Sequence, residues 1–283
     1  MVSKITPREH LEEVLASYSQ CDNERLHEIM TALSTHLLSF AEETKLTRAE
    51  WMQAIQFLTA TGQKCDDVRQ EFILLSDILG VSMLVEMINQ QPTDSATEPT
   101  VLGPFYVPGA PELSMGDSIA IDGDGGEPLA LRGTVRDSEG FPIDRAYLEV
   151  WQTSPQGFYD VQDPSLPPMS YRGNFTTGTD GEFVVRTVRP VDYQIPTDGP
   201  VGDLLGATGR ESWRPAHTHF MVSRDGYKTL ITHVFDAGSA HLRSDAVFGV
   251  RESLVIPMEQ GEATFDLVLD IIEGSSIEEV TGG

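Results

Sequence analysis

Four side chains between residues 159 and 219 have the chemistry of metal ligands. They are Tyr159, Tyr193, His217 and His219, and the two histidines stand in the segment Arg214-Pro-Ala-His-Thr-His-Phe220. In a β-strand, residues two apart point to the same face, so His217 and His219 can direct two nitrogens to one point. A strand at this position would therefore supply half of a metal site.

The two tyrosines narrow the choice of ion. Imidazole binds zinc, copper, iron and nickel, and affinity alone does not choose among them. A phenol has a pKa of about 10, so it binds as phenolate only when a strongly Lewis-acidic ion displaces its proton, which a hard trivalent ion does best. This favours ferric iron, Fe(III), as the cofactor. The alternatives are structural histidines, ordinary core tyrosines, or zinc in a hydrolase that uses only the His-x-His pair.

The surroundings of the four candidates favour a functional role. Tyr159 follows Pro155-Gln-Gly157, Tyr193 stands between Pro190 and Pro196, and Pro215 precedes His217. Proline and glycine of this kind mark turns, and residues in loops or at strand ends carry function more often than residues inside elements.

At these residues the chain resembles a known family, the intradiol ring-cleaving dioxygenases, which open catechols with a non-haem ferric ion. The resemblance covers most of the chain and rests on four segments: Leu102-Gly-Pro-Phe-Tyr106, Gly157-Phe-Tyr159, Pro190-Val-Asp-Tyr193 with Pro200 downstream, and Arg214–Phe220.

The resemblance implies a role for each donor. Tyr159 would stay on the iron, Tyr193 would leave it as a base when the aromatic diol binds, and His217 and His219 would anchor the metal throughout. Arg214 matches an arginine placed over the substrate ring, where its permanent charge helps the attack by O₂. The alternative for Arg214 is a surface salt bridge.

Within the family, the chain looks most like the branch that cleaves hydroxyquinol (1,2,4-trihydroxybenzene) with O₂ to 3-hydroxy-cis,cis-muconate, a tautomer of maleylacetate. The segments Val101–Ala110, Trp151–Asp163 and Ile231–Gly238 carry this finer match. His233 stands where catechol dioxygenases typically have glutamine. Catechol or chlorocatechol cleavage is the nearest alternative. A non-catalytic β-sandwich binding module of the transthyretin-like kind is the alternative from another class.

The branch also implies a substrate pocket, which is formed by the last N-terminal helix and the segment that follows it. A carboxylate in an apolar wall is unfavourable unless it meets a hydroxyl, so Asp77 would bind the extra ring hydroxyl. A capping or helix-surface carboxylate is the alternative. His233 would either contact the substrate or pack behind the ligand strand. The complete predicted set is Leu74, Asp77, Val101, Leu102, Gly103, Pro104, Phe105, Arg214 and His233.

Residues 1–100 are predicted to form a helical domain. Leu11, Val14, Leu15 and Tyr18 follow the 3.6-residue period of a helix. Thr47 and Glu50 form a capping box for a helix that we expect to end at Gly62. The apolar run Phe72–Ile88 predicts one or two buried helices. The family resemblance implies that these N-terminal helices pair two chains into a homodimer, which in many members holds a phospholipid.

Residues 101–283 are predicted to form a mainly β catalytic domain, an antiparallel β-sandwich. A connector rich in Pro, Thr and Gly runs from Pro92 to Pro111, and after it the apolar period becomes two. The segment Leu129–Val135 and the segment Ala146–Gln152 are expected to pair as a hairpin around the turn Asp137–Gly140. The other predicted strands are Glu182–Val188, Thr218–Val222, Lys228–Val234 and Ala263–Ile272.

Composition excludes several classes of partner. The net charge of −25, from 44 acidic and 19 basic residues, argues against nucleic acid and against an anionic membrane surface. No apolar stretch approaches the length of a membrane span, and the N-terminal residues do not resemble a secretory signal. Cys21 and Cys65 belong to no regular set and are expected to be buried thiols in a reducing compartment. The expected location is the cytoplasm.

Overall fold

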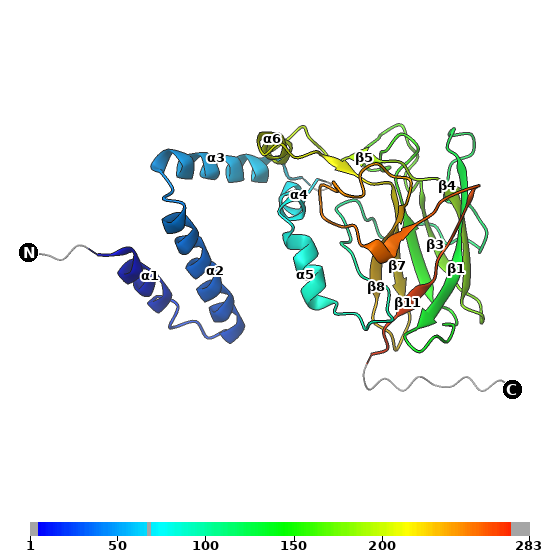
Figure 1. Cartoon of the computed structure of the whole chain (residues 1–283), viewed down its shortest axis with the longest axis horizontal. Helices are drawn as coiled ribbons and strands as arrows, with labels where there is room; N and C mark the ends of the chain where they lie inside the picture. Colours follow the sequence, from blue (N-terminus) through cyan, green and yellow to red (C-terminus); the bar gives the residue numbers. More distant parts are fainter. Residues whose placement is uncertain (1–4, 67–68, 273–283) are drawn as a thin grey trace, which may run out of the picture. The chain divides into compact units, whose positions relative to one another are not determined.

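The computed structural model describes residues 5–66 and 69–272. Contacts divide the chain into two compact units between Ala60 and Thr61. The domain boundary predicted at residue 100 is a different division and stays a prediction. Among the described residues the α-helices are, in chain order, α1 (Pro7–Ala16), α2 (Glu24–Glu43), α3 (Arg48–Lys64), α4 (Glu71–Ile78), α5 (Val81–Asn89) and α6 (Pro200–Ala207) (Figure 1).

Local sequence explains where these helices begin and end. The predicted capping box is present, because the Thr47 backbone N–H donates to the Glu50 carboxylate at 2.8 Å and the Glu50 N–H donates to the Thr47 hydroxyl at 3.3 Å. The helix α3 that follows runs to Lys64, past the predicted end at Gly62. The apolar run after it forms two helices, which Gly80 separates in the left-handed conformation with a φ of 75°.

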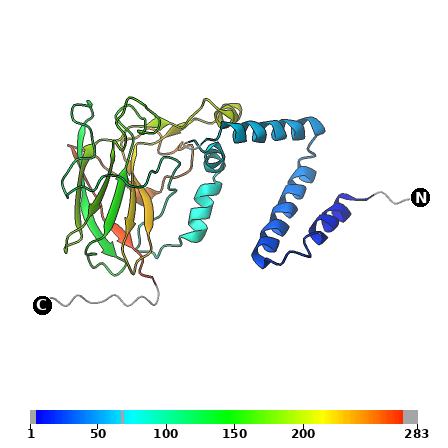
Figure 2. The same ribbon diagram turned by 180° about the vertical axis from the view of Figure 1, so that it is seen from behind.

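Two β-sheets pack face to face and form the main body of the second unit (Figure 2). The strands are β1 (Pro128–Asp137), β2 (Tyr147–Trp151), β3 (Arg172–Thr176), β4 (Glu182–Val188), β5 (Tyr193–Gln194), β6 (Trp213–Arg214), β7 (His217–Ser223), β8 (Leu230–Asp236), β9 (Val255–Ile256), β10 (Glu262–Thr264) and β11 (Leu267–Leu269). One sheet has the order β10-β1-β11 with β4 beside β1, and the other has the order β3-β2-β7-β8-β9. Strands β5 and β6 form a separate small sheet.

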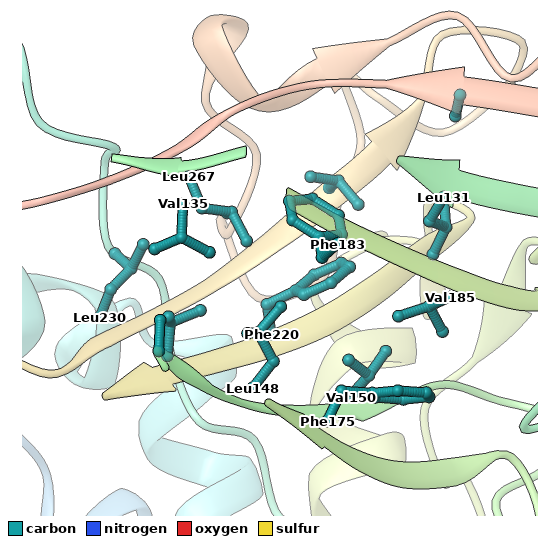
Figure 3. Packing of buried hydrophobic residues seen from close by; sticks show 14 of the residues in the cluster. Leu131, Val135, Leu148, Val150, Phe175, Phe183, Val185, Phe220, Leu230 and Leu267 are labelled. Carbon is teal, nitrogen blue, oxygen red and sulfur yellow. The ribbon is translucent and has the colours of Figure 1, made fainter. Parts of the chain in front are cut away.

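The hydrophobic core lies between the two large sheets. Alternate residues of each strand point inward, so Leu131 and Phe183 of the first sheet meet Val150 and Phe220 of the second. Figure 3 shows these side chains interdigitating. The predicted mainly β fold with N-terminal helices and a sandwich is confirmed. Most strand pairs are antiparallel, whereas β10 and β11 lie parallel to β1, and β9 lies parallel to β8.

The predicted hairpin between the first two strands is wrong. β1 pairs with β4, with Leu131 opposite Val185, whereas β2 pairs with β3 and β7 in the other sheet. The residues between β1 and β2 cross from one sheet to the other. The inward faces of the two strands then cover the same core from opposite sides. The turn at Asp137–Gly140 is present, since the Gly140 N–H donates to the Asp137 carbonyl at 3.0 Å.

Within residues 5–66 and 69–272, none of the helices combines the length and the apolar character that crossing a membrane requires.

Candidate metal centre

The four predicted donors lie together, although they come from three separate parts of the chain. His217 and His219 are on β7, Tyr193 is on the short strand β5, and Tyr159 is in the loop that follows β2. All four are buried, with Tyr159 only 1% exposed. The strand geometry directs both histidine rings to the same face of β7, as their spacing predicts.

The donor atoms are close enough to share one ion. The Tyr159 Oη lies 2.9 Å from the His219 Nε2 and 3.5 Å from the Tyr193 Oη. The Nε2 atoms of His217 and His219 are 3.2 Å apart. These separations suit neighbouring ligands of a first-row metal ion that lies about 2 Å from each donor.

The hydrogen bonds around His217 show that a cation fits between the donors. Its Nδ1 lies 2.6 Å from the Pro215 carbonyl, which places the proton on Nδ1 and leaves the Nε2 lone pair facing His219. The Nδ1 of His219 has no hydrogen-bond partner among the described residues. Two neutral imidazoles whose Nε2 atoms face each other are best satisfied by a positive ion between them.

Burial determines the charge state of this cluster. It lowers the pKa of His217 and His219 well below the usual value, and nearby positive groups, including Arg214, lower it further. Burial also raises the pKa of Tyr159 well above its usual value, and the neighbouring Tyr193 adds to this shift. The histidines are therefore neutral and could bind a metal ion, and a Tyr159 phenolate would require a strong positive charge beside it.

Arg214 provides a permanent positive charge at the edge of the cluster. It is 4% exposed and lies directly opposite Tyr193 in the β5–β6 pair. Its Nη1 donates to the Tyr193 Oη at 3.3 Å and lies 3.3 Å from the His217 Nε2. Burial alone would lower the pKa of Arg214, but the Asp245 carboxylate and the two tyrosines raise it above the usual value. Arg214 is thus not part of a surface salt bridge.

Aromatic rings and two glycines surround the donors. Phe105 stacks on Tyr159 at 4.8 Å, and Trp151 stacks on His219 at 4.6 Å. A Cβ on Gly157, which has a φ of 82°, would lie 3.1 Å from the Cβ of Tyr193. The glycine in the Gly-Phe-Tyr segment therefore allows the two tyrosine-bearing segments to approach each other.

The predicted pocket residues reach the donor cluster from two directions. From the connector, a Cβ on Gly103 would lie 3.4 Å from the His219 Cε1, and the Val101 backbone lies close to His233. Leu102 packs with Phe105 against the tyrosines and Trp151, and Pro104 between them is half-buried.

From helix α4, Asp77 approaches the cluster close enough to interact with Arg214 and Asp245. Asp77 is 4% exposed, and Leu74 lies one turn earlier and is also buried. Burial raises the pKa of Asp77, whereas the Ser82 hydroxyl and Arg214 lower it. The alternative of an exposed helix-surface carboxylate is therefore excluded.

His233 lies on β8 directly opposite His219 on β7, and the two ring centres are 4.0 Å apart. One ring nitrogen from each of His233, His217 and His219 lies within 4.8 Å of the other two. Neither ring nitrogen of His233 has a side-chain hydrogen-bond partner among the described residues. Burial lowers the pKa of His233, so the ring is neutral.

Sequence reasoning missed three carboxylates that hold the donors in place. Asp160 forms a buried ion pair with Arg172 at 2.6 Å, and Asp192 accepts the Ala216 N–H at 2.8 Å. Asp245 pairs with Arg214 at 3.2 Å. Asp160 and Asp192 each stand next to a donor tyrosine in sequence, which could have indicated them. Asp245 has no such neighbour, and only its place in the fold reveals its role.

Family models match both parts of the chain. A model described as "Dioxygenase" matches residues 101–272, and a model described as "Catechol dioxygenase N terminus" matches residues 23–97. The first match includes all four donors and Arg214. The second ends within the connector.

Individual relatives are similar over nearly the whole chain. The 6-chlorohydroxyquinol 1,2-dioxygenase of Cupriavidus pinatubonensis is 50% identical over 92% of this chain and 94% of its own. The catechol 1,2-dioxygenase of Candida albicans is 37% identical over 88% of this chain and 83% of its own. The crystal structure of hydroxyquinol 1,2-dioxygenase from Pseudomonas putida superposes with a TM-score of 0.89 at 43% identity, covering 94% of this chain and 99% of that one. With the sandwich, the buried donors and these matches together, the chain belongs to the intradiol ring-cleavage dioxygenases.

Proposed function

We propose that this dioxygenase binds Fe(III) through Tyr159, Tyr193, His217 and His219 and that its substrate is hydroxyquinol. The family is metal-dependent. The convergence of two phenol oxygens and two Nε2 atoms, with neighbouring distances from 2.9 to 3.5 Å, is the observation that carries the assignment of the site. Phenolate is a hard anionic ligand, which favours ferric iron over zinc.

When bound, ferric iron would supply Lewis acidity, chelating the two adjacent hydroxyls of the substrate and making its ring reactive toward O₂. The two hydroxyls then lose two protons, of which one can pass to a basic side chain of the protein and the other to water. Tyr193 suits this role, because its Oη lies at the edge of the cluster, 3.3 Å from the Nη1 of Arg214. A phenolate oxygen is basic enough to accept a substrate proton, and the guanidinium stabilises the anion before the transfer.

Tyr159 suits the role of the permanent ligand. Its ring is fixed by stacking on Phe105, and its Oη lies 2.9 Å from His219. The next residue, Asp160, is tied to Arg172, whose guanidinium carbon lies 5.8 Å from the centre of the Tyr159 ring. These contacts on both sides resist displacement, whereas Tyr193 lies on a strand of two residues.

Arg214 has an unused hydrogen-bond donor that the substrate could meet. Its Nη2 is buried and has no partner among the described residues. A fixed guanidinium beside a bound diol dianion would stabilise negative charge that develops on the ring as O₂ attacks. The surrounding aromatic residues exclude water, which strengthens this interaction.

Asp77 supports the preference for hydroxyquinol. It brings a buried carboxylate toward Arg214 from a helix whose neighbouring buried residues are apolar. A third ring hydroxyl can donate to this carboxylate, whereas catechol has no hydroxyl to offer there. The similarity to enzymes named for hydroxyquinol and 6-chlorohydroxyquinol agrees with this choice. Catechol or chlorocatechol is the alternative substrate.

The helices at the N-terminal end support a proposed homodimer. On α2, large apolar side chains are exposed at helical spacing, including Leu33 at 48%, Leu37 at 57% and Phe40 at 54%. A stripe of this kind on an amphipathic helix fits a second copy of the chain. A phospholipid held between the two copies is a further expectation from the family resemblance.

Steady-state kinetics on hydroxyquinol, catechol and 4-chlorocatechol test the proposed substrate. We expect the highest kcat/KM for hydroxyquinol and a product opened between adjacent hydroxyl carbons with both atoms of ¹⁸O₂ incorporated. A higher kcat/KM for catechol would assign the enzyme to the catechol branch. Cleavage beside the diol instead of between its hydroxyls would contradict the ferric assignment.

A further inference from the structure

The loop Ser244–Gly249 lies against Arg214 and is organised by one buried side chain, Asp245. The Asp245 Oδ1 accepts hydrogen bonds from the Arg214 Nε at 3.2 Å and from the Val247 N–H at 3.2 Å. Its Oδ2 accepts the Gly249 N–H at 2.9 Å. The side chain of Asp245 is 3% exposed, so water does not compete for these bonds. One carboxylate therefore orders the loop and holds the arginine.

This arrangement determines where the guanidinium plane lies. Asp245 holds Arg214 through Nε, and on the far side of the guanidinium Nη1 lies 3.3 Å from both the Tyr193 Oη and the His217 Nε2. Nη1 reaches Tyr193, and Nη2 remains without a partner among the described residues. A Cβ on Gly249 would lie 3.1 Å from Nη2 and 3.2 Å from the Asp245 Oδ2. The glycine thus leaves the room that the guanidinium occupies.

We propose that Asp245 is a positioning residue for the reaction, which fixes the Arg214 guanidinium against the donor cluster so that Nη1 stays beside Tyr193 and His217, at the edge where the diol would bind. This inference rests on the proposed function, because it assigns Arg214 to the substrate. Asp245 itself contacts none of the four donors through a hydrogen bond among the described residues; it acts through Arg214.

A second arginine ties the same loop to the helix that carries Asp77. Arg210 donates through Nη2 to the Ala246 carbonyl at 2.8 Å and through Nη1 to the Ile78 carbonyl at 2.5 Å. Its guanidinium also lies 4.6 Å from the centre of the Phe248 ring. Arg210 therefore links Ile78, the residue after Asp77, to the loop whose Asp245 holds Arg214. Asp77, which is proposed to select the substrate, and Arg214, which is proposed to activate it, are thus both connected to the loop Ser244–Gly249.

At position 245, only a carboxylate can accept all the hydrogen bonds that its neighbours donate. Three N–H groups approach its two oxygens, and none of the three can accept a hydrogen bond. In Asp245→Asn, the amide N–H₂ would face either the Gly249 N–H or the pair formed by Arg214 Nε and the Val247 N–H. The substitution keeps the size of the side chain but forces one edge of it to repel its partners, which releases the arginine.

Asp236 offers a matched control in the same unit. It is also a buried aspartate, which accepts from the Arg189 Nε at 2.6 Å and from the Gly238 N–H at 2.8 Å. Asp236→Asn thus removes a similar charge from a similar arginine pair. The pair lies outside the proposed catalytic machinery, so general effects of losing such a pair appear in this variant.

The experiment compares wild type, Asp245→Asn and Asp236→Asn, each purified with its iron. We expect Asp245→Asn to keep the iron content and the visible band of the resting protein, because the donors are untouched. Its kcat/KM for hydroxyquinol should fall by about 10- to 100-fold, the range typical of residues that orient a functional group. The affinity for 4-nitrocatechol, a slowly reacting diol titrated by its visible spectrum, should fall as well. Asp236→Asn should match wild type in both.

Gly249→Ala is the second variant if Asp245→Asn loses its iron or its fold. It leaves the Asp245 charge in place but crowds Nη2, and it should weaken 4-nitrocatechol binding while the iron remains. Wild-type affinity and turnover in both Asp245→Asn and Gly249→Ala would overturn the positioning role. So would equal losses in Asp245→Asn and Asp236→Asn. If the wild-type protein itself binds no iron or cleaves no diol, the proposed function fails instead, which is a separate result.

Discussion

At the scale of single residues, each of the two donor tyrosines is followed or preceded in sequence by an aspartate that is itself held by other side chains. Asp160 beside Tyr159 is held by Arg172, and Asp192 beside Tyr193 accepts the Ser239 hydroxyl at 2.5 Å. Such contacts fix the ring of a ligand before the metal arrives, which lowers the free energy that the ordering requires. The site therefore consists of four donors and a second set of carboxylates that hold them.

Replacing Asp77 tests the proposed origin of substrate choice. Asp77→Ala removes the acceptor for the third hydroxyl, and a hydrogen bond to a charged group is worth enough to lower kcat/KM for hydroxyquinol by about 10- to 100-fold. The kcat/KM for catechol should change far less. Glu86→Ala, on the adjacent helix α5, is the matched control. Equal losses on the two substrates would remove Asp77 from this role.

Replacing Tyr193 tests the proposed base. Tyr193→Phe keeps the ring but removes the oxygen that accepts a substrate proton, so kcat on hydroxyquinol should fall by about 100- to 10,000-fold. Three donors remain, and we expect iron to stay bound with an altered visible spectrum. Tyr227→Phe, a half-buried tyrosine outside the cluster, controls for the loss of a phenol hydroxyl. Wild-type turnover in Tyr193→Phe would show that another group takes the proton.

At the scale of elements, the sequence predicts the strand that carries the histidines but not how the other elements meet it. Alternation and the two-residue spacing predict the orientation of His217 and His219, because strand geometry is local. The pairing of β1 with β4 instead of β2 is not local, since the apolar faces of all three strands suit the same core. The approach of Asp245 to Arg214 depends on that topology, and no spacing along the chain encodes it.

The element that carries Asp77 is held in place by a buried glutamate. Glu71 at the start of α4 is fully buried and accepts the Val201 N–H at 3.2 Å in the first turn of α6. It also pairs with Arg69, which bonds to Asp198 at 2.6 Å. A Cβ on Gly199 would lie 2.4 Å from the Glu71 Oε1, so a larger residue there would push the carboxylate out of its contact with α6.

Glu71→Gln tests this support. The substitution turns one acceptor oxygen into a donor that faces either Arg69 or the Val201 N–H, and it should lower the free energy of unfolding by about 1–3 kcal/mol. Because α4 carries Asp77, the KM for hydroxyquinol should also rise. Denaturant unfolding and steady-state kinetics measure the two effects, with Glu43→Gln at the exposed end of α2 as the control. Unchanged stability would show that Glu71 does not hold α4 against α6.

At the scale of the whole molecule, the net charge argues against two kinds of partner, and the exposed apolar surface favours a third. The net charge of −25 repels nucleic acid and anionic membranes. The exposed apolar residues of α2 instead fit a second copy of the chain. The change from helical to strand periodicity predicts a domain boundary at residue 100, and this boundary stays a prediction.

Leu33→Glu tests the proposed dimer. A charge in the middle of the exposed stripe should convert a protein with twice the mass of one chain into a monomer, as measured by size-exclusion chromatography with light scattering. Ala32→Glu places the same charge on an exposed residue about 100° around the helix from Leu33, outside the apolar stripe, and should leave the dimer intact. A monomeric wild-type protein would contradict the dimer without affecting the metal site.

The visible spectrum of the purified protein, measured together with its metal content, tests the proposed binding of ferric iron by two tyrosines and two histidines of this chain. We predict stoichiometric iron and a red to purple colour from phenolate-to-Fe(III) charge transfer, which changes when hydroxyquinol binds. Removing the iron with a chelator should bleach the colour, since burial raises the pKa of Tyr159 and the free phenol regains its proton. A colourless protein that contains zinc or no metal, and still cleaves hydroxyquinol, would contradict the proposed Fe(III) site.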